Sequence, residues 1–181
     1  EKLLEEDYRH PVPTGIDGLD NILNGGLAKG EIGVILAPTG VGKTTMLTRF
    51  ANSAYNMGYN VLQIFFEDNP KIIQRKHFTC WTGIPNDELS EHKETVLDKA
   101  DEMKKTGGKL ILKKLPSDEM SMLQIKNQVR KIISEGTKID MVLIDYIDCI
   151  LPDRAFTDEW KGEGSVMRKF EGMCHELDIA G

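Results

Sequence analysis

The chain has 181 residues, a formal net charge of −6 at pH 7, and 40% hydrophobic and 29% charged residues. This length suits one domain with a sizeable buried core, and the composition is that of an ordinary globular protein. The acidic balance argues against a general nucleic-acid coat, which carries a basic face, but it allows a ring or filament that contacts DNA through a few local loops. No apolar run approaches the length of a membrane span.

The first part of the chain is predicted to contain an arm, a short helix and a strand. Residues 1–13 are charged and end in a proline-flanked segment, which is typical of a linker or arm. Thr14 is expected to cap a short helix that closes at the glycine pair 25–26. The run 32–36 (IGVIL) is short, apolar and rich in β-branched residues, so we expect a buried strand there.

Strands and helices alternate through the remainder. Apolar residues at helical spacing predict helices over 46–54, from the start signal 68–70 onward, and over 86–106, 121–135 and 166–177. Apolar runs predict strands over 61–66, 110–112 and 140–146, and the start of another at 179–181. Residues 151–164 are polar and are predicted to form a loop. This alternation predicts an α/β fold with a mostly parallel sheet covered by helices on both faces.

The segment 37–45 (APTGVGKTT) lies between the strand 32–36 and a predicted helix, which is the context that a P-loop requires. Its glycines let backbone N–H groups turn toward phosphate oxygens, and the helix N-terminus adds partial positive charge. The predicted nucleotide-binding residues are Ala37, Pro38, Thr39, Gly40, Val41, Gly42, Lys43, Thr44 and Thr45. Lys43 would reach the β- and γ-phosphates, and Thr44 would place its hydroxyl on Mg²⁺. The usual pattern starts with glycine, where this chain has Ala37.

Two acidic positions follow apolar strands. Asp145 closes the run 141–145 (MVLID), at the sheet edge where open α/β folds bind ligands, so we predict that it holds Mg²⁺ through water. Hydrolysis of ATP also needs a group that orients and polarises the attacking water. We assign this catalytic role to Glu67, directly after the strand 61–66, and expect Asp68 to cap the next helix.

The segments 14–20 (TGIDGLD) and 26–31 (GLAKGE), together with the P-loop, resemble the RecA-type ATPase core, and the resemblance covers about residues 14–180. Three further features resemble the DnaB-like replicative helicases of bacteria and phages. They are Ala37 early in the P-loop, Glu67 after the second strand, and the pair Asp145-Tyr146 that closes the Walker B strand. The segment 166–180 is also similar to the helix that leads those helicases into their next core strand.

The KaiC and RadA branch of the same class is a second interpretation. The segments 27–31 (LAKGE) and 65–68 (FFED) are similar to its signatures, and its output would be recombination or signalling. We favour the helicase branch, chiefly because of Ala37 and the C-terminal helix. A third interpretation, a nucleotide-dependent binding or assembly module without turnover, stays open.

The helicase resemblance implies a homo-oligomer, a hexameric ring that hydrolyses ATP with Mg²⁺ and translocates on single-stranded DNA. It also implies a primase or loading factor as partner, no membrane, and a bacterial or phage-infected host cytoplasm. The γ-phosphate sensor, the arginine finger and a second DNA loop would lie beyond Gly181, and no primase-interacting domain precedes residue 14. We therefore expect an arm at 1–13 and a partial core at 14–181 that binds nucleotide but hydrolyses it poorly.

Several other polar and aromatic residues receive structural interpretations. The segment 151–165 contains Arg154 and Lys161, as a DNA loop would, but also four acidic residues, so a plain solvated loop is an equal alternative. Trp160 could stack on a base, although we expect it to pack. Phe78 and Trp81 are predicted to belong to the core. His77 shares an apolar helix face and is predicted to be structural. Three cysteines without a C-x-x-C pair, Cys80, Cys149 and Cys174, are expected to be reduced and mostly buried.

Overall fold

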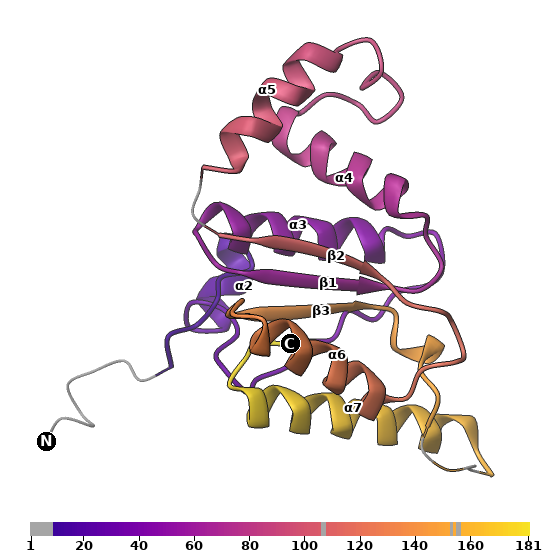
Figure 1. Cartoon of the computed structure of the whole chain (residues 1–181). Coiled ribbons are helices and arrows are strands. Elements are labelled where there is room, and N and C mark those ends of the chain that lie inside the picture. The colour runs from indigo at the N-terminus through magenta and orange to yellow at the C-terminus, as the bar shows by residue number, and fades with distance from the viewer. Residues whose placement is uncertain (1–8, 106–107, 153, 155–156) are drawn as a thin grey trace, which may run out of the picture.

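The computed structural model describes residues 9–105, 108–152, 154 and 157–181. A parallel sheet forms the middle layer, in the order β2-β1-β3. Its strands are β1 (Val61–Phe65), β2 (Leu110–Lys114) and β3 (Met141–Asp145). Helices lie on both faces of the sheet, with α3, α4 and α5 on one side and α6 and α7 on the other (Figure 1). The predicted α/β fold with a mostly parallel sheet is confirmed.

The helices follow the predicted order, with differences at their ends. Their bounds are α2 (Asp17–Ile22), α3 (Lys43–Asn56), α4 (Pro70–Thr82), α5 (Lys93–Met103), α6 (Met122–Ser134) and α7 (Glu159–Leu177), with a 3-10 turn, η1, at Ile147–Cys149. The start of α6 is fixed by a capping box, in which the Ser121 hydroxyl accepts from the Gln124 N–H and the Gln124 side chain accepts from the Ser121 N–H. None of the helices in the described ranges is long and apolar enough to cross a membrane.

Two apolar clusters hold the layers together. On one face, Leu62, Ile64 and Val142 of the sheet pack against side chains of α6 and α7. The α6 and α7 members of this cluster are Met122, Ile125, Val129, Val166, Phe170, Met173 and Cys174. On the other face, Val61, Met141 and Leu143 pack against Ala51 and Ala54 of α3, where small residues let the helix approach the strands closely.

The C-terminal residues 179–181 add a short fourth member to the sheet, as predicted. Ala180 pairs in parallel with Met141. On its other side, Gly33 N–H donates to the Gly181 carbonyl at 2.9 Å, and Gly181 N–H donates to the Glu31 carbonyl at 3.0 Å. This short strand therefore lies between β3 and the residues that lead into the P-loop segment.

The prediction of a buried strand over 32–36 is wrong. Val34 and Leu36 are 62% and 96% exposed, and the segment is irregular. Backbone pairing with residues 179–181 reaches Gly33, and residues 34–36 pair with no strand among the described residues. Their apolar, β-branched sequence is that of a strand, but strand geometry needs a ladder partner.

Three helix boundaries also differ from prediction. Thr14 does not cap α2, because the Asp20 carboxylate accepts from the Thr14 hydroxyl and N–H and from the Gly15 N–H, and so closes the turn ahead of the helix. Residues 86–92 fold as turns, and α5 begins only at Lys93. The predicted loop 151–164 becomes helix from Glu159, since burial of apolar side chains farther along α7 outweighs the roughly 1 kcal/mol that each interior glycine costs. Gly107, predicted to stop the preceding helix, lies outside the described residues.

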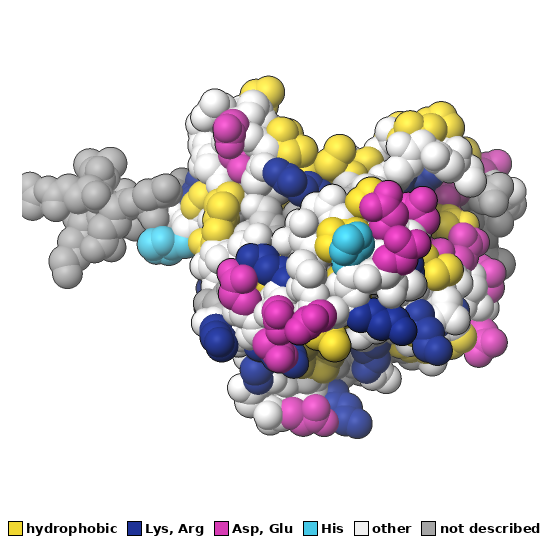
Figure 2. All heavy atoms as spheres, turned by 90° about the horizontal axis from the view of Figure 1, so that it is seen from above, with side chains coloured by type: hydrophobic (Ala, Val, Ile, Leu, Met, Phe, Trp, Pro, Cys, Tyr) yellow, Lys and Arg dark blue, Asp and Glu magenta, His cyan; other side chains and the backbone are white. Residues whose placement is uncertain are grey.

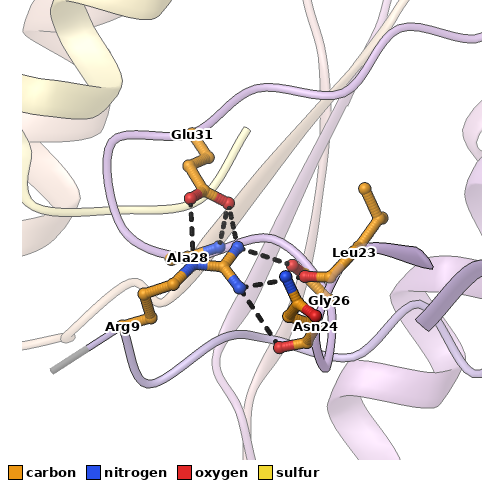
Figure 3. Close-up of polar contacts among 6 residues, drawn as sticks. All are labelled: Arg9, Leu23, Asn24, Gly26, Ala28 and Glu31. Atoms are coloured by element: carbon orange, nitrogen blue, oxygen red, sulfur yellow. Dashed lines mark hydrogen bonds and ion pairs between the residues drawn. The ribbon is translucent and has the colours of Figure 1, made fainter. Parts of the chain in front are cut away.

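A partly buried arginine, Arg9, contacts the turn that precedes the P-loop segment (Figure 3). The guanidinium of Arg9 donates to both carboxylate oxygens of Glu31, at 3.2 and 2.7 Å, and to three backbone carbonyls. Those carbonyls belong to Leu23, Asn24 and Gly26. The Ala28 N–H also donates to Glu31, and these hydrogen bonds, that of Arg9 first, lower the pKa of Glu31. Val12, close by, is buried and pairs with Leu27.

We expect Arg9→Ala to lower the free energy of unfolding by about 1–2 kcal/mol, because it removes several charge-assisted hydrogen bonds from a partly buried site. Urea denaturation at pH 7 measures this. The matched control is Lys104→Ala, which breaks an exposed ion pair with Asp101 and should leave stability nearly unchanged. Equal effects of the two substitutions would contradict a special role for Arg9.

Candidate nucleotide-binding site

The segment 37–42 forms a tight turn that leads into α3. Gly42, with a φ of 104°, precedes the first helical residue, Lys43. The Lys43 ammonium folds back over the turn and donates to the carbonyls of Ala37 at 2.8 Å and Pro38 at 3.1 Å. The first N–H groups of a helix have no acceptor within the helix, so the turn presents backbone donors and a lysine around one small space. This arrangement suits a chain of phosphate groups.

The predicted metal ligands lie together. Asp145 ends β3, near Thr44 at the start of α3. Burial raises the pKa of Asp145, as does the nearby Asp68, while the neighbouring Thr44 hydroxyl and the charges of Lys76 and Lys43 lower it. A partly buried carboxylate beside a hydroxyl gains from a cation between them.

The protein oxygens at this site suit a Mg²⁺ ion that is bound together with a nucleotide better than a Mg²⁺ ion bound by the protein alone. Within the described ranges, no group of three or more His, Cys, Asp or Glu side chains could hold a metal ion. Mg²⁺ commonly takes only one or two protein oxygens and completes its coordination with phosphate oxygens and water. Thr44 and Asp145 are such a pair, next to the turn that suits phosphates.

The strand register brings the second acidic position to the same edge. Phe65 of β1 pairs with Asp145 of β3, so the two strands end at the same level and Glu67 follows two residues after this pair. The Tyr146 hydroxyl donates to Glu67 Oε1 at 2.9 Å. This hydrogen bond, with burial second, raises the pKa of Tyr146, so the phenol stays protonated at neutral pH. Lys114, at the end of β2, donates to the Glu67 carbonyl at 3.1 Å.

Asp68 has a different role from the predicted one. The N-cap of α4 is Asn69, whose side chain accepts from the Lys71 N–H at 2.9 Å, with Pro70 at the first helical position as expected. Asp68 pairs instead with Lys76 at 3.3 Å, and both charges act on Asp145. The sequence prediction thus missed Lys76, Lys114 and Tyr146 as neighbours of the site. The position of Tyr146 directly after a strand-end aspartate was the one available signal.

The candidate DNA segment is only partly described, since residues 153, 155 and 156 lie outside the described ranges. Trp160 is 68% exposed in the first turn of α7, so the prediction that it packs is wrong. The Lys161 ammonium lies 5.3 Å from the Trp160 ring centroid and pairs with Asp158. Seen from above, acidic and basic side chains of the described residues are interspersed, without a broad basic surface (Figure 2).

A buried polar network connects α3, β1 and α4 behind the site. His77, 1% exposed, lies 3.1 Å from Asn52 Oδ1 and 3.0 Å from Gln63 Oε1. Asn52 also accepts from the Trp81 indole at 2.6 Å. Burial lowers the pKa of His77 to about 4, so the ring is neutral and carries a single N–H. Because Gln63 Nε2 is buried without a partner, we place that amide with its nitrogen toward the ring.

The remaining structural predictions concern His77, two aromatic side chains of α4 and the three cysteines. The structural interpretation of His77 is in agreement with its burial. Phe78 and Trp81 are half-buried and meet edge to face, with ring centroids 5.6 Å apart, so the prediction that they belong to the buried core is wrong. Cys149 and Cys174 are buried, Cys80 is exposed, and no disulfide joins these three thiols.

The turn, the strand-end carboxylates and the parallel sheet define a RecA-like P-loop ATPase domain. Residues 12–163 match the family described as "ATPase: KaiC", and the chain belongs to this family. The predicted RecA-type class is therefore confirmed, and its members are ATPases that bind nucleotide.

Relatives of both predicted branches match the chain. The DNA repair protein RadA of Aquifex aeolicus (strain VF5) is 30% identical over 131 residues, which cover 72% of this chain and 26% of that protein. The replicative DNA helicase DnaB of Helicobacter pylori (strain ATCC 700392 / 26695) is 26% identical over 171 residues, which cover 93% of this chain and 35% of that protein. The chain thus spans about a quarter to a third of these two relatives.

Solved structures show the same fold. The ATPase domain of G40P superposes with a TM-score of 0.79 at 18% identity, over 99% of this chain and 65% of that one. A DnaB-like replicative helicase, described with its interactions with primase, gives a TM-score of 0.81 at 18% identity, over 99% and 45% of the two chains. The fold of this domain is therefore the fold of DnaB-like helicase ATPase domains.

We expect stability to fall by about 2 kcal/mol between pH 7 and pH 5 through His77 alone. Its folded pKa of about 4 lies below the unfolded value near 6.5, so the unfolded chain binds more protons in this window and unfolding becomes easier as the pH falls. Urea denaturation at both pH values measures the loss.

The matched comparison uses His77→Gln and His92→Gln, the latter at an exposed position. The pH-dependent loss should shrink by most of that amount in His77→Gln and stay unchanged in His92→Gln. Identical pH profiles for the two variants would contradict a neutral buried His77.

Proposed function

We propose that this chain is the ATP-binding and ATP-hydrolysing motor domain of a DnaB-like replicative DNA helicase. The observation that carries the nucleotide site is the turn before α3, over which the Lys43 ammonium folds to donate to the carbonyls of Ala37 and Pro38. The helicase branch is supported by the match to DnaB, which extends over 93% of this chain, against 72% for RadA.

Each side chain at the site has a chemical task in this proposal. Lys43 and the N–H groups at the start of α3 bind the β- and γ-phosphates of ATP, and Thr44 and Asp145 hold Mg²⁺. The bound Mg²⁺ supplies positive charge that offsets the charge on the phosphate oxygens. Glu67 accepts a hydrogen bond from water and orients it for attack on the γ-phosphorus. It takes up the proton of the water as the new P–O bond forms, while the bond from the γ-phosphorus to the bridging oxygen breaks and ADP leaves.

The proposal extends to partners. A homohexameric ring would carry single-stranded DNA through its centre, with a primase or loading factor as further partner. The exposed Trp160 supports contact with DNA, because an aromatic ring with a neighbouring lysine stacks on bases without regard to sequence. Localisation to the cytoplasm of a bacterium or a phage-infected host belongs to the same proposal.

A RadA- or KaiC-type ATPase in recombination or signalling is the second candidate, favoured by 30% identity to RadA over 131 residues. ATPase activity of the full-length protein, with and without single-stranded DNA, separates the candidates. Stimulation by DNA together with strand unwinding supports the helicase. Filament formation on DNA supports the recombinase, and turnover indifferent to DNA supports a KaiC-like switch.

Lys43→Ala should abolish tight ATP binding, because it removes the ammonium that faces the phosphates. Equilibrium binding of a fluorescent ATP analogue to the full-length protein measures this, and we expect affinity to fall by at least about 100-fold, the scale of a lost charge-assisted contact. Lys131→Ala, at a 71% exposed position far from the turn, serves as control and should bind normally. Unchanged affinity in Lys43→Ala would refute the P-loop assignment.

Glu67→Gln should leave ATP binding intact and reduce turnover by about 10²–10⁴-fold, the usual contribution of a positioned base. Steady-state ATPase assays on the full-length protein give kcat and KM separately. Asp68→Asn is the informative neighbour, since its carboxylate pairs with Lys76 and should contribute less. A larger loss in Asp68→Asn than in Glu67→Gln would transfer the catalytic role to Asp68.

A further inference from the structure

We infer that Tyr146 is a positioning residue for ATP hydrolysis, whose hydroxyl holds the Glu67 carboxylate in one orientation. The inference rests on the proposed function, because it concerns the base of that reaction. In the sequence, Tyr146 was noted only as part of the Asp145-Tyr146 pair that resembles DnaB-like helicases.

The backbone around both residues is fixed by the sheet. Phe65 and Asp145 are paired at the ends of β1 and β3, and the Phe66 N–H donates to the Asp145 carbonyl at 3.3 Å. Tyr146 is the next residue after this pair on one strand, and Glu67 lies two residues beyond it on the other. The 2.9 Å hydrogen bond from Tyr146 Oη to Glu67 Oε1 therefore spans two strand ends whose separation the ladder sets.

Glu67 is otherwise poorly constrained. Its side chain is exposed, and the other bond to this residue, from Lys114 on β2, is made to the backbone carbonyl. An exposed glutamate samples several rotamers, and fixing them costs conformational entropy. The hydrogen bond from the Tyr146 hydroxyl already restricts the Glu67 rotamers in the folded protein, so this entropy is not lost during the reaction.

The chemistry leaves the base functional. A protonated phenol donates one hydrogen bond, and it occupies Oε1 only. Glu67 Oε2 stays available to accept from water and to take its proton. The contact of the Tyr146 hydroxyl is with Glu67, so its contribution passes through that carboxylate.

The ring of Tyr146 packs against the apolar cluster on the α6 and α7 face. Tyr146→Phe keeps this packing and deletes only the hydroxyl, so the variant separates positioning from folding. We expect kcat for ATP to fall about 5- to 30-fold, the scale of one freed side chain, with KM and ATP affinity unchanged within about twofold.

The experiment uses the full-length protein with ATP and Mg²⁺, and compares wild type with Tyr146→Phe, Glu67→Gln and the double variant. A residue that acts through Glu67 should lose its effect once Glu67 is replaced, so the double variant should turn over as slowly as Glu67→Gln and no slower. Tyr59→Phe is the matched control, since it loses a hydroxyl near Pro11, at the opposite end of β1. Its kcat should be unchanged.

Three results would overturn the inference. They are a normal kcat in Tyr146→Phe, a further loss when the substitution is added to Glu67→Gln, and a change in ATP affinity instead of kcat. Failure of the proposed function gives a different pattern, in which turnover is absent from wild type or does not depend on Glu67. That pattern overturns both statements, whereas Glu67-dependent turnover with a neutral Tyr146→Phe overturns the inference alone.

Discussion

The parallel ladder of β1 with its two neighbours sets the geometry on which the rest of the site depends. Phe65 pairs with Lys114 on one side and with Asp145 on the other, so the three strands end at the same level. Residues far apart in sequence emerge there together, since parallel strands present their carboxyl ends at one edge. A shift of one residue in either pairing would turn Glu67 or Asp145 to the opposite face of the sheet.

The two faces of the sheet support this edge in different ways, one by apolar packing and the other by hydrogen bonds. The α6 and α7 face is packed with large apolar side chains and supplies most of the burial. The α3 and α4 face carries small residues and the polar contacts among Asn52, Gln63 and His77. Hydrogen bonds have directional requirements that apolar packing lacks, so this network fixes how α3 and α4 sit on β1. Both helices begin at the site, so this network also fixes the positions of their first turns.

Much of this arrangement could be predicted from the sequence. Apolar runs and helical spacing identified the elements, and the P-loop pattern identified the turn at Lys43 and Thr44, because these signals are local. A strand at 32–36 was predicted from composition, yet strand geometry depends on pairing with a neighbour, which residues 34–36 lack within the described ranges. The start of α7 was missed because interior glycines resemble a loop unless the burial of Val166 and Phe170 is known. Lys76, Lys114 and Tyr146 reach the site through strand register and helix orientation, which no local pattern encodes.

The turn before the P-loop segment also has a consequence for sequence variation within the family. Gly30 has a φ of 81°, its N–H donates to the Ile179 carbonyl, and a Cβ there would lie 2.6 Å from the His175 ring. A larger residue would be strained at this positive φ and would displace the His175 ring. At Gly18 and Gly172 a Cβ would meet nothing within 4 Å. Relatives that keep this fold can therefore carry other residues at positions 18 and 172. Position 30 favours glycine, because its φ is positive and the His175 ring lies close.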